Sequence, residues 1–97
     1  MKKFLVLTYG FTPPTEEIKS AWGAWFASVG SRLVDPGSPF GRGVELTTTG
    51  RTDLSLDSPA PLVGYCILNA DSLAEAEELV ATMPIIESVR VYEAHSM

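Results

Sequence analysis

The chain has 97 residues, of which 45% are hydrophobic and 20% charged, and its formal net charge is −5. This length and composition are those of one globular domain, so we expect a single domain over residues 1–97. The seven Lys and Arg residues are scattered, which argues against a nucleic-acid partner, because neutralising phosphates requires clustered cations. The N-terminus resembles neither a signal peptide nor a membrane span, so we expect a cytoplasmic protein without a membrane partner.

The first elements are a strand and an aromatic helix. Residues 4–9 form an apolar, β-prone run that stops at Gly10. Two prolines and two glutamates suit the start of a helix at about Thr15, and Gly30 is a natural residue to end it. Apolar residues recur between them at helical spacing, which indicates one buried helix face: Ile18, Trp22, Trp25, Phe26 and Val29.

The middle of the chain is rich in turn residues. Residues 32–34 read as a short extended stub, and the Pro/Gly-rich residues 35–43 read as a loop. Residues 44–48 are the next strand candidate, and we interpret them as the strand that completes the first β-α-β half. Residues 52–61 alternate weakly and carry two prolines, which predicts an irregular edge or a loop.

The second half repeats the β-α-β order over residues 64–93. A strand, Gly-Tyr-Cys-Ile-Leu-Asn, precedes a helix whose start has an S-x-x-E capping box at Ser72 and Glu75. Pro84 ends this helix, and Ser-Val-Arg-Val-Tyr-Glu is the last strand. We expect Glu75 to point toward water together with Glu77 and Glu78.

The strands of this pattern are apolar on both faces. Alternation directs Phe4 and Val6 to one side and Leu5 and Leu7 to the other. Two short helices cover only one face of a four-stranded sheet, so a second copy of the chain is expected on the other face. The sequence therefore predicts an α+β protein, a ferredoxin-like β-α-β-β-α-β plait that forms a homodimer.

The chain resembles the YCII-related proteins over nearly its whole length. The resemblance rests on the Trp-rich first helix, the loop Leu-Val-Asp-Pro-Gly-Ser-Pro-Phe-Gly, the segment Gly-Tyr-Cys-Ile-Leu-Asn-Ala-Asp-Ser-Leu-Ala-Glu-Ala, and Pro84 followed by Val-Arg-Val-Tyr-Glu. It implies a dimeric α+β barrel. Some members of the family are thought to use a His–Asp pair, but the matching places here hold Ala21 or Trp22 and Met83, so both members of the pair are absent.

A ligand cleft is expected between the first helix, the end of the first strand and the loop of residues 35–43. Aromatic surface and spare polar groups coincide only there, and the family's site near the first helix supports the placement. Two alternatives stay open: the tryptophans as core or dimer contacts, and the loop as a purely structural connection. The candidate ligand-binding residues are Tyr9, Trp22, Trp25, Asp35 and Arg42.

No complete catalytic, metal or cofactor motif is present in the sequence. The single cysteine, Cys66, is interpreted as a packed apolar residue and His95 as a terminal surface residue. We therefore expect no metal or cofactor, and a homodimer that binds a small molecule. The alternative is a cofactor-free lyase, isomerase or monooxygenase acting on a small, possibly aromatic, organic molecule, with Asp35, Tyr9, Tyr65 or Arg42 replacing the missing pair.

Overall fold

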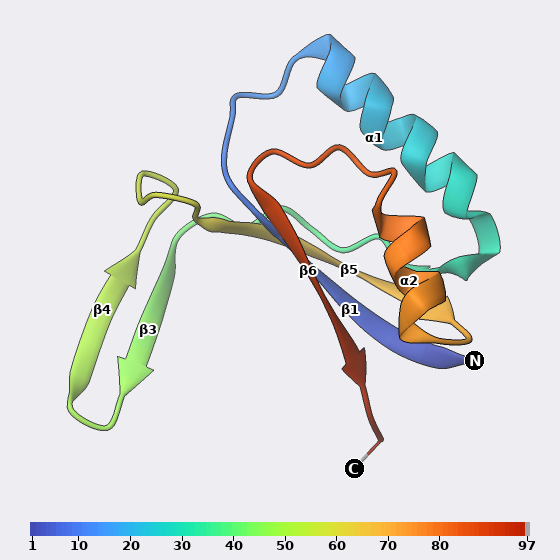
Figure 1. Cartoon of the computed structure of the whole chain (residues 1–97). Helices are drawn as coiled ribbons and strands as arrows, with labels where there is room; N and C mark the ends of the chain where they lie inside the picture. Colours follow the sequence, from blue (N-terminus) through green and yellow to red (C-terminus); the bar gives the residue numbers. More distant parts are fainter. Residues whose placement is uncertain (97) are drawn as a thin grey trace.

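The computed structural model describes residues 1–96, and Figure 1 shows a sheet with two helices on one side and a separate hairpin. The elements are β1 (Lys2–Tyr9), α1 (Glu16–Val29), the 3₁₀ turn η1 (Gly30–Arg32), β2 (Leu33–Asp35), β3 (Gly43–Thr47), β4 (Gly50–Leu54), β5 (Leu62–Ala70), α2 (Leu73–Val80) and β6 (Ser88–Ala94). Four strands form an antiparallel sheet in the order β2-β5-β1-β6. The fold is α+β and compatible with the predicted ferredoxin-like plait.

The strand that completes the first β-α-β half is β2, so the prediction that residues 44–48 fill this place is wrong. Leu33 of β2 pairs with Leu68 of β5. The chain then continues along the same edge, where Pro39 forms a bridge to Gly64 and the Phe40 N–H donates to the carbonyl of Val63 at 2.6 Å. Residues 33–40 thus occupy the β5 edge, which leaves no place there for residues 44–48.

The strands β3 and β4 pair only with each other and form a hairpin, called the arm below (residues 43–54). Residues 52–61, which were expected to form an irregular edge or a loop, therefore begin with the end of β4. Every residue of both arm strands is exposed, and an isolated two-stranded hairpin is marginally stable at best in water. In Figure 1 the arm leaves the end of the sheet and lies on the side away from the helices.

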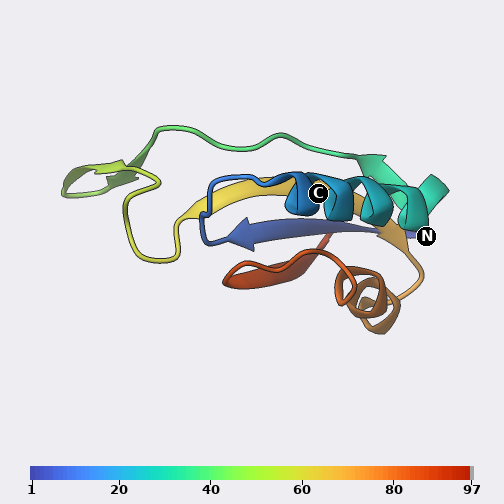
Figure 2. The ribbon, with the colours of Figure 1, turned by 90° about the horizontal axis from the view of Figure 1, so that it is seen from above.

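The core lies between the helices and one face of the sheet, and Figure 2 shows α1 lying over the strands. Phe4, Val6 and Leu68 are fully buried on that face, and strand alternation directs their neighbours to the opposite face. The remaining core members are Trp25, Val29, Cys66, Ala70, Ala76, Val80 and Met83.

The sheet face opposite the helices is called the bare face. It carries, from β1, β5 and β6, the side chains of Leu5, Leu7, Tyr9, Val63, Tyr65, Ile67, Arg90 and Tyr92. These side chains are half-buried or exposed, in contrast to those under the helices. The prediction that β1 and β5 are apolar on both faces is confirmed.

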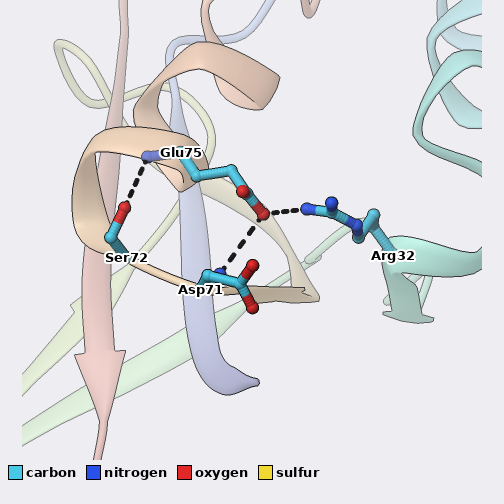
Figure 3. Close-up of polar contacts among 4 residues, drawn as sticks. All are labelled: Arg32, Asp71, Ser72 and Glu75. Carbon is cyan, nitrogen blue, oxygen red and sulfur yellow. Dashed lines mark hydrogen bonds and ion pairs between the residues drawn. The ribbon is translucent and has the colours of Figure 1, made fainter.

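The start of α2 is held by the polar cluster of Figure 3. The Glu75 N–H donates to Ser72 Oγ at 3.1 Å, which confirms the predicted N-cap. The Glu75 carboxylate, expected to point to water, instead accepts a hydrogen bond from the Asp71 N–H at 3.2 Å and pairs with Arg32 of η1. It turns inward because Arg32, at the end of the segment that follows α1, lies within reach. The pair connects the end of α1 to the start of α2.

Within residues 1–96, no helix is both long enough and apolar enough to cross a membrane.

Candidate ligand-binding site

A cavity of about 360 Å³ lies at one end of the sheet and is called the α1 pocket below. Its walls come from four parts of the chain: the end of β1 with the turn after it, α1, the edge segment after β2 together with β5, and the segment before β6. The lining residues are Thr8, Tyr9, Gly10, Phe11, Thr12, Ile18, Trp22, Phe26, Pro36, Ser38, Pro39, Phe40, Leu56, Val63, Gly64, Tyr65, Cys66, Pro84, Ile85, Ile86, Ser88 and Val89.

The aromatic wall of the pocket comes from α1. Ile18, Trp22 and Phe26 are spaced four residues apart, so their side chains lie one above another on the same helix face. The rings of Trp22 and Phe26 have their centroids 5.7 Å apart. Thr15 fixes the start of the helix, because its Oγ1 accepts a hydrogen bond from the Ile18 N–H at 3.2 Å.

The two tryptophans have different places. Trp25 is only 2% exposed, lies in the core and does not line the pocket. Its ring meets that of Trp22 edge to face, with the centroids 5.9 Å apart and the planes at 87°. Trp22 is half-buried and forms part of the pocket wall. Trp25 therefore supports the wall from behind.

Asp35 lies outside the pocket and organises the loop that borders it. Its Oδ1 accepts a hydrogen bond from the Gly37 N–H at 2.8 Å, and its Oδ2 accepts one from the Tyr65 hydroxyl at 3.4 Å. Gly37 has a φ of +75°, and a Cβ there would lie 1.7 Å from the carbonyl oxygen of Tyr65. The turn therefore requires glycine, and Asp35 acts on the shape of the loop.

Arg42 lies at a different hollow, of about 600 Å³, at the base of the arm. Phe40 borders both hollows, and its ring stacks on Tyr65 with the centroids 5.7 Å apart. Asp35 and Arg42 thus do not converge on the α1 pocket. Of the five residues predicted from the sequence, Tyr9 and Trp22 line it, although the Tyr9 ring lies on the bare face, with its centroid 4.6 Å from the Arg90 guanidinium carbon.

Cys66 lies on the sheet side of the pocket and is buried. Burial, with a smaller contribution from the negative charge of Asp35, raises the pKa of its thiol to about 11. The thiol is therefore protonated at neutral pH, and a protonated thiol is a poor nucleophile. His95 lies outside the pocket with its side chain 78% exposed, 3.9 Å from the carboxylate of Glu93.

The pocket has no charged lining. Among residues 1–96, every side chain that lines it is apolar, aromatic, a hydroxyl or the Cys66 thiol. The same residues contain no group of three His, Cys, Asp or Glu side chains that could hold a metal ion. The arrangement can therefore enclose and orient a molecule, but it offers no ionised general acid or base inside the cavity.

Sequence reasoning missed the aromatic and aliphatic residues that the loops contribute. Phe11 follows Gly10 in a Pro-rich turn, and Ile85 and Ile86 follow Pro84. All three are large apolar residues in segments that would otherwise be polar loops, which is a signal for a ligand or contact site.

No family model, no curated protein and no solved structure matches this chain.

Proposed function

We propose that the chain is a small-molecule-binding homodimer whose ligand lies in the α1 pocket. The observation that carries the proposal is a cavity of about 360 Å³ with an almost wholly apolar lining and a few hydroxyl groups. Ligand sites typically have volumes of about 300–1,000 Å³ and are mostly apolar with a few polar groups that fix orientation. The relationship to the YCII-related proteins stays a prediction.

Binding is better supported than catalysis. A cofactor-free lyase, isomerase or monooxygenase would need a positioned acid or base within reach of the substrate. Asp35 and Arg42 lie outside the pocket, and the carboxylate of Asp35 already accepts hydrogen bonds from the Gly37 N–H and the Tyr65 hydroxyl. Tyr9 and Tyr65 are the remaining candidates from the alternative, and both line the cavity, but their side chains are directed to the bare face, where Arg90 lies over the Tyr9 ring and the Tyr65 hydroxyl donates to Asp35. No specific observation favours a reaction for them.

The homodimer is supported by the bare face and the arm. The bare face exposes apolar side chains, of which Tyr92 is 51% exposed. The arm lies on the same side of the sheet (Figure 1) and has no partner within the described chain that buries its strands. In a two-fold dimer the same patch of each copy covers the other, so one contact would cover both the face and the arm.

The size of this surface suits a stable dimer. Four strands about 4.8 Å apart and about seven residues long outline roughly 450 Å² in projection, before side-chain relief is counted. A standard interface takes about 800 Å² of accessible surface from each partner. The bare face and the arm together are of that order, which favours a second copy of the chain as the occupant.

Binding can be tested with N-phenyl-1-naphthylamine, an uncharged dye whose fluorescence rises when it leaves water. We expect saturable binding to the full chain and at least tenfold weaker binding to Trp22→Ala. Leu73→Ala is the control, because Leu73 is 52% exposed on α2, away from the pocket. Circular dichroism should show both variants folded. Equal affinity of the wild type and a folded Trp22→Ala variant would overturn the proposed site.

A further inference from the structure

We infer that the α1 pocket selects an uncharged, flat, two-ring molecule that carries one hydroxyl or carbonyl group, and that it rejects the matching carboxylate. This inference rests on the proposed function, because it names the ligand class of the same site. It is carried by the charge, the volume and the hydroxyl groups of the pocket.

The charge of the site disfavours an anion. Among residues 1–96 no Lys, Arg or His lines the cavity, so a bound carboxylate would lose its hydration without gaining a cationic partner. The negative charge of Asp35 acts on Cys66, on the sheet side of the pocket, and contributes to the raised pKa of its thiol. A negative potential there adds repulsion to the cost of desolvation.

The volume sets the size of the ligand. An apolar cavity of about 150 Å³ accepts one benzene molecule, and the α1 pocket is about 360 Å³. This is somewhat more than twice the volume, so two fused rings fit. The rings of Trp22 and Phe26 offer aromatic surface against which a flat ring packs well.

The polar groups of the pocket are neutral hydroxyls. Thr8, at the end of β1, lines the cavity and pairs with Gly64 and Val89, so its side chain lies on the helix side of the sheet, where Val89 packs against the core. No hydrogen bond between side chains or to the backbone within residues 1–96 uses its hydroxyl. The hydroxyl can therefore donate to, or accept from, one hydroxyl or carbonyl group of the ligand.

The test compares 2-naphthol with 2-naphthoate by isothermal titration calorimetry at pH 7, using the full chain. The two compounds share the ring system and differ in charge. We expect 2-naphthol to bind at least tenfold more tightly than 2-naphthoate, and Trp22→Ala to weaken its binding at least tenfold.

A charge variant supplies the converse test. Thr12→Arg places a cation in the turn between β1 and α1, at a position that lines the pocket, and we expect it to strengthen 2-naphthoate binding at least tenfold relative to the wild type. Ser20→Arg is the control: it introduces the same cation at an exposed position of α1 that does not line the cavity. It should leave the affinity for 2-naphthoate unchanged within about twofold.

The outcomes separate the two proposals. If 2-naphthoate binds as tightly as 2-naphthol and depends on Trp22, the ligand class is wrong while the binding site stands. If neither compound binds but the dye still depends on Trp22, the ligand class is again wrong and the site stands. If dye binding does not depend on Trp22, the site itself is wrong, and the inference fails with it.

Discussion

The indole Nε1–H of Trp25 donates a hydrogen bond to the carbonyl oxygen of Leu79 at 2.9 Å, and this bond joins α1 to α2. It accounts for the different places of the two tryptophans. The ring of Trp25 lies in the core between the helices and the sheet, whereas Trp22, three residues earlier in α1, reaches the pocket. One helix thus supplies both a core anchor and the wall of a binding site.

Replacing Trp25 with Phe should therefore cost more stability than the same change at Trp22. Trp25→Phe removes the hydrogen bond to Leu79, worth about 1 kcal/mol, and leaves a small void in the core. We expect a loss of about 1–3 kcal/mol in the free energy of unfolding, measured by urea denaturation. Trp22→Phe should lose less than half as much, because Trp22 is only half-buried. Equal losses would contradict the assignment of Trp25 to the core.

Two glycines should respond in opposite ways to alanine. Gly37 has a φ of +75°, and its Cβ would collide with the carbonyl oxygen of Tyr65, so Gly37→Ala should destabilise the chain by about 2 kcal/mol or more. Gly23 is exposed within α1, and a Cβ there meets no atom within 4 Å. Gly23→Ala should stabilise the chain by about 0.5–1 kcal/mol, because alanine favours a helix over glycine. Thermal unfolding of both variants measures the difference, and destabilisation by Gly23→Ala would show that α1 is packed differently.

The sequence predicted the main elements well because their signals are local. The apolar run at residues 4–9 lies within β1, and Thr15, where the helix was expected to start, is the N-cap of α1. The assignment of residues 44–48 failed because two nearby segments are both β-prone. Which of them joins the sheet depends on pairing with β5, about 30 residues further along the chain, and local patterns do not report that pairing.

The candidate site was predictable only in part, because only some of its residues are placed by local signals. Tyr9 and Trp22 follow from where a strand ends and which helix face is aromatic. The orientation of the Asp35 side chain depends on the turn at Gly37, and the place of Arg42 depends on the base of the arm. Neither is visible in the spacing of residues, so the sequence placed these two charges in a cleft that contains neither.

The stability of the chain should depend on Cys66 at alkaline pH. The pKa of the thiol is raised from 9.0 to about 11 in the folded chain, so between these values the unfolded chain has lost the proton and the folded chain keeps it. The unfolded state then binds fewer protons, and the free energy of unfolding falls as the pH rises. The contribution of the protonated Cys66 thiol to the free energy of unfolding is fully present below pH 9. It is lost toward pH 11, by an amount on the order of 2 kcal/mol.

The measurement is the difference in unfolding free energy between the wild type and Cys66→Ala at several pH values from 7 to 11. The other ionisable groups are common to both proteins, so their contributions cancel in the difference. We expect a constant difference up to about pH 8.5 and a steady change above it in favour of Cys66→Ala. A difference that stays constant to pH 11 would show that the thiol is not shielded as the structure implies.

Charges on the bare face should dissociate the proposed homodimer. Leu7→Arg places a cation in the centre of that face on β1, directly opposite Arg90, and Tyr92→Arg places a cation on β6 at a side chain that is 51% exposed. In a dimer through this face both charges would be buried without a partner, at a cost of several kcal/mol. Sedimentation velocity at micromolar concentration should show a wild-type dimer and monomeric variants, while Leu73→Glu on the helix side stays dimeric. Tyr92→Arg is the decisive variant, because an exposed position lets the monomer keep its fold. A wild type that sediments as a monomer, or a folded Tyr92→Arg variant that stays dimeric, would place the contact elsewhere or remove it.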